Sequence, residues 1–261
     1  FKHEPIQTKD GLFWDWQFLV EQVITGLKAA TKLGRIHSVG IDSWAVDYGL
    51  IDKSGAVISQ PYCYRDARTD GVMAKLKEEL GVDYIYSKTG IQFIFFNTMY
   101  QLFIEKESTA YKNADKFLMV PDLLNYLLCG SISTEITNAS TTQLLNVHTR
   151  DWDWQIIEKL GIKKDIFPKI NKPKQEMGVI TGYGELDGIK VISVGSHDTA
   201  SAVAGTPLPE SGDAAYISSG TWSLVGLELA KPVTDKKAME FNITNEMGVA
   251  DRIRFIKNVA G

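Results

Sequence analysis

The chain has few cysteines and histidines and no long apolar run. Its two cysteines, Cys63 and Cys129, lie far apart among 261 residues, so we expect neither a disulfide framework nor a cysteine-based metal site. The flanks of the four histidines show none of the close carboxylate or cysteine spacings that make a zinc site recognisable, which disfavours a zinc hydrolase. No apolar run reaches the length of a membrane span, and no leader resembles a signal peptide. These absences predict a soluble protein of the reducing cytoplasm, without a membrane partner.

The chain also lacks an excess of basic residues and any P-loop. Its formal net charge is −4, and its Lys and Arg residues are scattered, so no basic face is available to bind a nucleic-acid backbone. We therefore expect no nucleic-acid partner. No G-x-x-x-x-G-K-[ST] motif occurs, which means that any nucleotide site must be built in another way. At 261 residues the chain is long enough for one large domain or two smaller ones.

Periodic patterns of apolar residues predict strands that alternate with helices. Residues 16–30 place apolar side chains on one face at helical spacing. A buried strand at 116–120 leads into a helix at 121–129, which has Pro121 near its first turn and Gly130 as a stop. This alternation favours an α/β fold. The other predicted strands are 36–42, 44–52, 56–59 and 189–194, and the other predicted helices are 71–80, 98–105 and a segment from Trp154 to near Gly161.

Glycine and proline cluster at residues 205–212, which predicts a boundary between two units. A new unit is expected to start near Asp213, with strands at 214–218 and 221–229 joined by a tight turn. Before the boundary, residues 62–69 form a polar loop of the kind that often lines a pocket.

One carboxylate follows the end of a predicted strand, where a helix begins. The strand-like run stops at Gly195, and small residues follow Asp198. In open α/β folds the pockets lie beyond the carboxyl ends of strands, so Asp198 can accept a proton from a bound hydroxyl. Taken alone, Asp198 is better explained as a helix N-cap. His197, at the same turn, can donate to a substrate hydroxyl, although a lone histidine is more often structural.

A second small, polar turn, Ser218-Ser219-Gly220-Thr221, follows downstream. Glycine lets the backbone approach a ligand closely, and free amides and hydroxyls suit phosphate oxygens. Taken alone, this tetrapeptide favours a plain hairpin turn. Together with Asp198 it suggests phosphoryl transfer to an alcohol.

Two further groups of charged residues allow competing interpretations. Asp42 and Asp47 could be imagined as the paired carboxylates of a glycosidase, but strand alternation would turn them to opposite faces, which disfavours that pairing. Arg65, Asp66 and Arg68 could hold sugar hydroxyls through directional hydrogen bonds. They could equally form a surface ion-pair network.

Several stretches of the sequence, in order, resemble the FGGY carbohydrate kinases: residues 40–48, 64–69, 137–140, 196–203 and 218–223. The resemblance runs through nearly the whole chain. It implies an α/β, actin-like (ribonuclease H-like) ATPase fold, in which two domains, each a sheet flanked by helices, hold sugar and ATP in the cleft between them. Residues 1–207 are then expected to form the sugar-binding domain, and residues 208–261 the start of the nucleotide-binding domain.

The resemblance implies that Asp198 is the catalytic base. In that role Asp198 takes a proton from the C1 hydroxyl of L-rhamnulose while the hydroxyl oxygen attacks the γ-phosphate of ATP, and ATP and Mg²⁺ are the implied cofactors. No metal-ligating residue of the protein itself is expected. The implied substrate contacts are Ala45, His197, Asp198, Thr199 and Asn258, with Arg65, Asp66 and Arg68 as weaker matches, and the implied ATP contacts are Ser219, Gly220 and Thr221.

The chain departs from the family pattern in two respects. Ala45 stands where relatives commonly have glycine, so an added methyl group is expected to narrow the pocket. The family's opening hairpin with its phosphate loop would lie before Phe1, and its adenosine-binding segment after Gly261, so we expect a fragment that binds ATP poorly. A kinase for fuculose or xylulose and a non-catalytic sugar-binding fragment remain as alternatives. The protein is expected to be a monomer or a homodimer.

Overall fold

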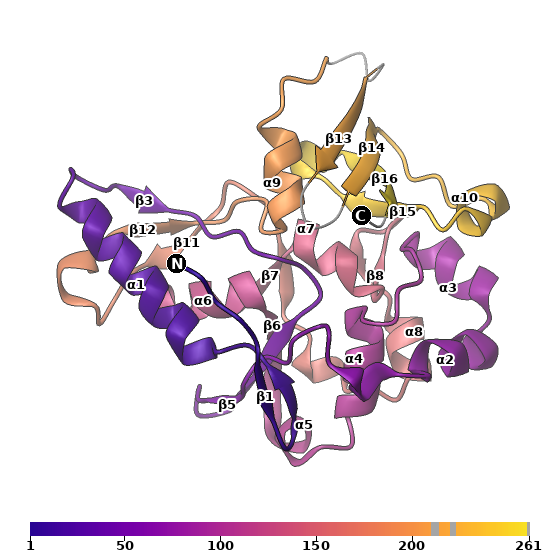
Figure 1. Ribbon diagram of the computed structural model, residues 1–261, viewed down its shortest axis with the longest axis horizontal. Helices are drawn as coiled ribbons and strands as arrows, with labels where there is room; N and C mark the ends of the chain where they lie inside the picture. The colour runs from indigo at the N-terminus through magenta and orange to yellow at the C-terminus, as the bar shows by residue number, and fades with distance from the viewer. Residues whose placement is uncertain (210–213, 220–222, 260–261) are drawn as a thin grey trace.

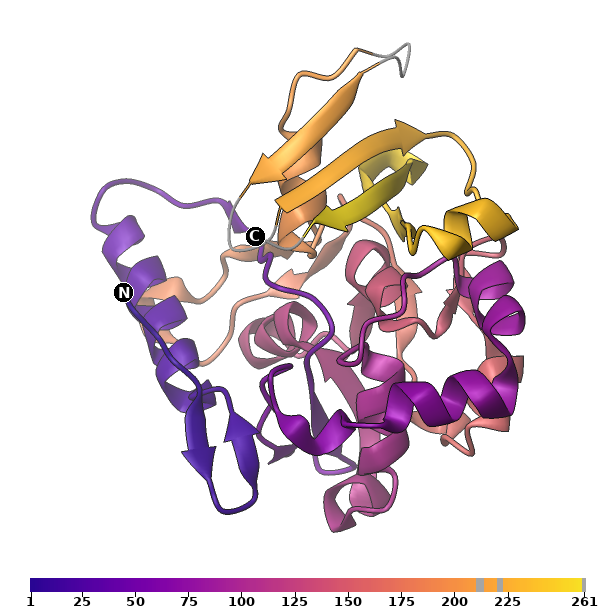
Figure 2. The same ribbon diagram turned by 45° about the vertical axis from the view of Figure 1, so that its right-hand side comes forward.

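The computed structural model describes residues 1–209, 214–219 and 223–259. Several small sheets with helices around them make up a mixed α/β arrangement (Figure 1). A four-stranded sheet from the C-terminal segment lies at the top of this view, above the larger part of the chain. The same two layers are visible from a second direction in Figure 2.

The larger part is built from the residues before helix α9 (Asp198–Ala204). Its central sheet has the strand order β5-β4-β6 with antiparallel pairing, and a second sheet, β11-β12-β3, brings the N-terminal strand β3 parallel to β12. The strands are β1 (Ile6–Thr8), β2 (Gly11–Phe13), β3 (Ser38–Val39), β4 (Tyr48–Asp52), β5 (Val57–Ser59), β6 (Ala114–Met119), β7 (Ser133–Glu135), β8 (Leu145–Asn146), β9 (Asp151–Trp152), β10 (Lys169–Asn171), β11 (Glu176–Val179) and β12 (Lys190–Ile192). The helices are α1 (Trp16–Thr31), α2 (Val72–Leu80), α3 (Val82–Thr89), α4 (Thr98–Glu105), α5 (Thr109–Asn113), α6 (Val120–Cys129), α7 (Ile136–Ala139) and α8 (Trp154–Lys159).

Successive residues along β6 and into α6 enter different apolar cores. Phe117 and Met119 pack in one cluster with residues of α2, α3, α4 and α8, whereas Leu118 and Val120 pack in the other with residues of α1 and α6. Side chains alternate across a strand, so a sheet that is covered on both faces buries every residue. Such a strand appears in sequence as a continuous apolar run, and the predicted strand at this position is confirmed.

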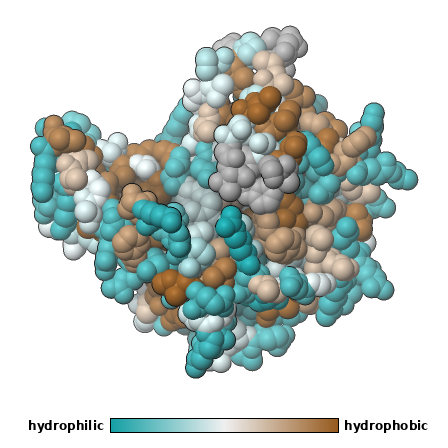
Figure 3. All heavy atoms as spheres, viewed as in Figure 1, coloured by the Kyte–Doolittle hydropathy of each residue, from teal (hydrophilic) through white to brown (hydrophobic). Residues whose placement is uncertain are grey.

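The C-terminal segment forms the upper sheet. Its strand order is β13-β14-β16-β15 and every pair is antiparallel. Tyr216 points into a small apolar cluster with Val203 and Ile256, whereas the next residue, Ile217, is 71% exposed. Apolar side chains gather on the surface over this sheet (Figure 3). The elements are α9 (Asp198–Ala204), β13 (Ala215–Ser219), β14 (Ser223–Leu229), α10 (Lys236–Glu240), β15 (Thr244–Met247) and β16 (Ile253–Val259).

The predicted helix ends agree well with the structure, because they rest on local backbone chemistry. Helix α6 has Pro121 in its first turn, and Gly130 follows its end in the left-handed region at φ 73°. Glycine reaches this region without steric cost, so it is well suited to end a helix. The predicted pairing of the strands on either side of residues 219–220 is also confirmed by the antiparallel β13-β14 pair, although residues 220–222 lie outside the described ranges.

The predicted strands at 36–42 and 44–52 are too long. Only β3 and β4 have regular strand geometry there. Val46 takes the left-handed backbone conformation at φ 67°, and the amide of Asp47 donates to the carbonyl of Ala45 at 2.9 Å. An extended strand cannot pass through such a turn, and a β-branched residue rarely adopts it. The turn directs the segment before it away from the central sheet.

No helix among the residues that the structure describes is both long and apolar enough to cross a bilayer. The longest of them, α1, has 16 residues and packs against the central part of the molecule. Cys63 and Cys129 are both free thiols, and Cys63 is buried.

Asp47 is a fully buried carboxylate at the start of the central sheet. Its Oδ2 accepts from the indole nitrogens of Trp14 at 2.7 Å and Trp44 at 3.0 Å, and from the amide of Tyr64 at 3.1 Å. Its Oδ1 accepts from the side-chain amide of Gln101 at 3.1 Å. Burial raises the pKa of Asp47 to about 6, although these donors oppose the shift. Asp47 therefore ties the segment containing Trp44 to the core.

We predict that Asp47 makes stability depend on pH. Its pKa in the folded protein lies above the unfolded value of 3.8, so the folded state holds the proton between about pH 4 and 6. The contribution of protonated Asp47 is present below pH 4 and is lost as the pH rises through 6, by roughly 3 kcal/mol. Urea unfolding of the unmodified chain and Asp47→Asn at pH 4 and pH 7 measures this. An unchanged difference in free energy of unfolding between the two proteins would contradict it.

Candidate functional site

A cavity of about 400 Å³ opens between the upper sheet and the larger part of the chain. Its walls come from segments far apart in sequence, including the loop before β4, the turn before α9 and the strands β13, β14, β15 and β16. The predicted site residues that line it are Ala45, His197, Asp198, Thr199, Ser219 and Asn258. The structure therefore brings these predicted residues together, while the role of each remains a prediction.

The turn that carries Asp198 differs from the N-cap interpretation. His197 occupies the cap position and Asp198 is the first helical residue of α9. The Oδ1 atom of Asp198 accepts from the amide and the hydroxyl of Thr199, the latter at 3.0 Å. The Asp198 side chain is 53% exposed and lines the cavity. The N-cap explanation of Asp198 is thus wrong, and its carboxylate is accessible to a ligand.

Backbone hydrogen bonds hold this turn beside the loop that contains Ala45. The amide of Ser43 donates to the carbonyl of Ser196, and the amide of Asp198 donates to the carbonyl of Ser43, each at 2.9 Å. This short parallel bridge joins two segments that the sequence separates by more than half the chain. Ala45 and His197 meet in the same cavity because of it.

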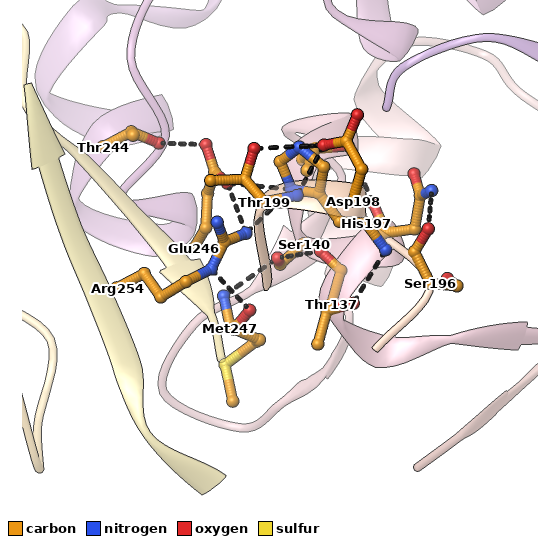
Figure 4. A network of polar contacts seen from close by, with 12 residues as sticks. Thr137, Ser140, Ser196, His197, Asp198, Thr199, Thr244, Glu246, Met247 and Arg254 are labelled. Carbon is orange, nitrogen blue, oxygen red and sulfur yellow. Dashed lines mark hydrogen bonds and ion pairs between the residues drawn. The ribbon is translucent and has the colours of Figure 1, made fainter. Parts of the chain in front are cut away.

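Glu135 accepts several hydrogen bonds that hold the turn before α9 in place. Its Oε2 accepts from the amide of Ser196 at 2.9 Å, from the Ser196 hydroxyl at 3.0 Å and from the amide of Thr137 at 3.0 Å. The hydroxyl of Thr137 also donates to Glu135. The same hydroxyl accepts from the amide of His197 at 3.1 Å (Figure 4). Burial raises the pKa of Glu135, although these donors favour the charged form. One buried carboxylate thus fixes the backbone that presents His197 and Asp198.

We predict that Glu135→Gln destabilises the chain by about 1–3 kcal/mol, because an amide group replaces an acceptor that faces several donors. Urea unfolding at pH 7 measures the free energy of unfolding. The matched control is Glu176→Gln, since Glu176 is on the surface and its ion pair with Lys190 is half exposed. The free energy of unfolding of that control should stay within about 0.5 kcal/mol of the value for the unmodified chain. A Glu135→Gln value within the same range would contradict the role given to Glu135.

His197 is contacted from the upper sheet by an ion pair. Its Nδ1 lies 2.7 Å from Nη2 of Arg254 and 3.2 Å from Oε2 of Glu246. The same Arg254 nitrogen donates to Glu246 Oε2 at 2.7 Å (Figure 4). Burial opposes ionisation of Glu246, but the charge of Arg254 prevails and lowers the pKa of Glu246 to about 2. Sequence reasoning missed this pair, because nothing in the local sequence links β15 and β16 to the turn before α9.

Three of the predicted substrate contacts lie outside the lining of this cavity. Asp66 accepts from the amide of Arg68 at 2.8 Å, and the Arg68 side chain, only 14% exposed, pairs with Glu105 at 3.2 Å. Neither Asp66 nor Arg68 lines the cavity, and their role as sugar contacts stays a prediction. Both belong to an ion-pair network, which is partly buried rather than on the surface. Arg65 is exposed, and its Cζ atom lies 5.4 Å from the ring centre of Tyr64. Tyr64 lines the cavity.

Two other predictions concern the ATP-phosphate turn and the pair of carboxylates at Asp42 and Asp47. Gly220 and Thr221, predicted beside the ATP phosphates, lie outside the described residues. The paired-carboxylate idea does not hold, because Asp47 is enclosed by donors while Asp42 is exposed. The pKa of Asp42 is raised by partial burial and by the charge of Asp198, so this second acid lies near the turn that carries Asp198.

Apolar and aromatic side chains form much of the cavity wall, which sequence reasoning did not foresee. Trp44, Val46, Tyr64, Ile91 and Phe96 all line it. They come from three separate segments, so no periodic pattern marks them as neighbours. The polar residues of the turn before α9 face this apolar wall.

Comparison with known proteins decides the family. The sequence profile described as "FGGY family of carbohydrate kinases, N-terminal domain" matches residues 7–205, which is most of the chain. The chain belongs to the FGGY family of carbohydrate kinases. This FGGY family member is 46% identical to the rhamnulokinase of Mannheimia succiniciproducens over 100% of the chain and 54% of that protein. It is 45% identical to the rhamnulokinase of Bacillus subtilis over 97% of the chain and 53% of that protein.

Solved structures agree on the fold. A ligand-bound xylulose kinase from Lactobacillus acidophilus matches with a TM-score of 0.88 at 20% identity, over 99% of this chain and 54% of that chain. A glycerol kinase from Plasmodium falciparum with ADP matches with a TM-score of 0.83 at 16% identity, over 100% of this chain and 55% of that chain. These FGGY kinases confirm the predicted actin-like α/β fold. This FGGY family member spans about half the length of the curated relatives it matches.

Proposed function

We propose that these residues carry the sugar site of an ATP-dependent sugar kinase that converts L-rhamnulose to L-rhamnulose 1-phosphate. The observation that supports this most directly is the half-exposed carboxylate of Asp198, which lines the cavity beside His197. Rhamnulokinases at 45–46% identity over nearly the whole chain support the choice of sugar.

Asp198 acts as the general base in this proposal. It takes the proton of the C1 hydroxyl while that oxygen forms a bond to the γ-phosphorus of ATP. The bond from the γ-phosphorus to the bridging oxygen breaks, and ADP leaves with the electron pair. The Asp198 carboxylate is exposed to the cavity, and hydrogen bonds from the amide and hydroxyl of Thr199 hold its position. Positioning of the two substrates supplies much of the catalysis.

The nucleotide is proposed to approach from the upper sheet. Ser219, at the end of β13, lines the cavity and comes directly before the predicted phosphate turn. A boundary that gives residues 1–207 to the sugar domain and 208–261 to the nucleotide domain is supported by the FGGY N-terminal profile, which ends at residue 205. Among the described residues, no three or more His, Cys, Asp or Glu side chains are grouped so that they could hold a metal ion. Mg²⁺ is proposed to enter with the nucleotide, bound through its phosphates.

The apolar wall supports a 6-deoxy sugar as the substrate. L-Rhamnulose ends in a methyl group, which has no hydrogen bonds to satisfy and gains free energy when it leaves water. Trp44, Val46, Ile91 and Phe96 offer such a surface in the cavity. A five-carbon ketose such as xylulose has no sixth carbon to place there. Fuculose carries the same methyl group and differs only in the orientation of its hydroxyls.

Rates with a panel of ketoses test the substrate. For a version of the protein extended to full family length, we expect kcat/KM for L-rhamnulose to exceed that for xylulose by roughly 10- to 200-fold, because one methyl group in an apolar pocket contributes about 1–3 kcal/mol. Fuculose should fall between them. Faster turnover of fuculose or xylulose would overturn the choice of L-rhamnulose but not the assignment as a sugar kinase.

A further inference from the structure

The side of the His197 ring that faces away from Asp198 is closed by charged residues. Arg254, in β16, is fully buried and contacts Nδ1 through Nη2 at 2.7 Å. Glu246, in β15, lies 3.2 Å from the same ring nitrogen. The other ring nitrogen, Nε2, lies 3.5 Å from Oδ1 of Asp198. The ring is therefore held between the upper sheet and the acid of the cavity (Figure 4).

The hydrogen-bonding chemistry of the Arg254 guanidinium group indicates which ring nitrogen of His197 carries the hydrogen. Arginine donates hydrogen bonds and has no acceptor, so the 2.7 Å contact between Arg254 Nη2 and Nδ1 is a hydrogen bond only when Nδ1 is the acceptor. The competing arrangement, with Nδ1–H donating to Glu246 at 3.2 Å, would leave the shorter contact of Nδ1 with Arg254 Nη2 without a hydrogen bond. The two hydrogens of Nη2 suffice for both partners, because one can point to Glu246 Oε2 at 2.7 Å and the other to His197.

We propose that Arg254 and Glu246 are positioning residues that fix His197 as the Nε2–H tautomer, with its donor directed toward the cavity beside Asp198. Glu246 holds Arg254 in place through the ion pair, and Arg254 donates a hydrogen bond to the unprotonated Nδ1. Arg254 is further anchored by a hydrogen bond from its Nε to the carbonyl of Met247 at 3.4 Å. The amide of Met247 in turn donates to the hydroxyl of Ser140 at 2.9 Å, which ties the pair to the larger part of the chain.

The tautomer sets what kind of ligand fits at this point. An Nε2–H donor next to a carboxylate acceptor matches two neighbouring oxygens of a polyol or ketose. One oxygen accepts from His197, and the other donates its hydrogen to Asp198. The match to a sugar rests on the proposed function, whereas the tautomer itself does not. By fixing the tautomer, Arg254 and Glu246 in the upper sheet contribute to sugar binding without touching the sugar.

Nitrogen-15 NMR of the histidine rings tests the proposal directly, because a protonated and an unprotonated ring nitrogen have distinct chemical shifts. The chain has only four histidines, and the His197 signals are those that disappear in His197→Asn. We expect protonated Nε2 and unprotonated Nδ1 at neutral pH. A neutral ring with the hydrogen on Nδ1 would overturn the proposal, whether or not the protein phosphorylates a sugar.

The double variant Arg254→Met/Glu246→Met tests the cause, since it removes the Arg254 donor, leaves no buried charge and places no new donor beside Nδ1. We expect the Nε2–H preference of His197 to be lost, and L-rhamnulose affinity, followed in the same spectra, to fall roughly tenfold or more. The matched control is Arg252→Met, because Arg252 donates to the carbonyl of Glu228. This control should leave the tautomer of His197 and the affinity for L-rhamnulose unchanged. An unchanged tautomer in the folded double variant would overturn the role of the pair. If the double variant does not fold, the nitrogen-15 spectrum of His197 in the unmodified chain still tests the proposed tautomer.

An absence of L-rhamnulose binding by the unmodified chain, with the Nε2–H tautomer observed, would count against the proposed substrate and leave the positioning pair supported. The charged groups that face His197 are Asp198, Glu246, Arg254 and, more distantly, Asp42. The measurements should therefore be made at one pH, at which all of these acids are ionised, so that only the substitution changes the ring.

Discussion

Asp198→Asn is expected to lower kcat for sugar phosphorylation by about 10²- to 10⁴-fold, the usual contribution of a general base. Asparagine keeps the shape of the side chain and can still accept a hydrogen bond from the sugar hydroxyl, so KM should change little. It cannot take the proton, so the chemical step becomes slow. A loss in kcat with little change in KM is the pattern of an interaction made in the transition state. Steady-state rates of a version extended to full family length measure both constants.

Two controls make this result specific. Asp187→Asn changes an exposed acid that only bonds the amide of Tyr183, and it should leave kcat unchanged. Asp42→Asn is the more demanding comparison, because the pKa of Asp42 is raised by partial burial and by the charge of Asp198. Unchanged turnover of Asp198→Asn would remove Asp198 from the base role. A large loss in Asp42→Asn alone would transfer that role to Asp42.

Arg254→Met is expected to destabilise the chain by about 3–5 kcal/mol. The substitution leaves Glu246 as an unpaired charge in a buried position, and removing one partner of a buried ion pair is strongly destabilising. A domain is stable by only about 5–15 kcal/mol, so the variant should be close to unfolding. Urea unfolding at pH 7 measures the loss.

Neutralising the second partner should recover much of that stability. In Arg254→Met/Glu246→Gln no buried charge remains, so the double variant should be more stable than Arg254→Met alone. Arg252→Met, with its partly exposed side chain, should stay within about 0.5 kcal/mol of the unmodified chain. A single variant as stable as this control, or a double variant no more stable than the single, would contradict the energetic role of the pair.

The sequence was sufficient for elements whose signals are local. The strand before α6 could be predicted because both of its faces are buried, and the end of α6 because Gly130 supplies a left-handed residue. The turn that carries Asp198 could be found because an acid follows a strand and precedes a helix. The backbone turn at Val46 could not, since a β-branched residue gives no warning of positive φ.

The rest of the site depends on partners that are distant in sequence. Arg68 resembled a sugar contact because its charge was visible while its partner Glu105 was not. The same reason hid Arg254 and Glu246, whose contact with His197 exists only after the upper sheet meets the turn before α9. Sequence resemblance supplied the names of candidate residues, and tertiary structure decided which of them share one cavity.

The most direct test of the whole account is phosphorus-31 NMR of a version extended to full family length, incubated with Mg-ATP and L-rhamnulose. The account predicts that ATP disappears as ADP and one sugar phosphate accumulate in equal amounts, with the phosphate on the C1 oxygen. Release of inorganic phosphate without a sugar phosphate, or phosphate on a different hydroxyl, would contradict the proposal that Asp198 activates the C1 hydroxyl in this cavity.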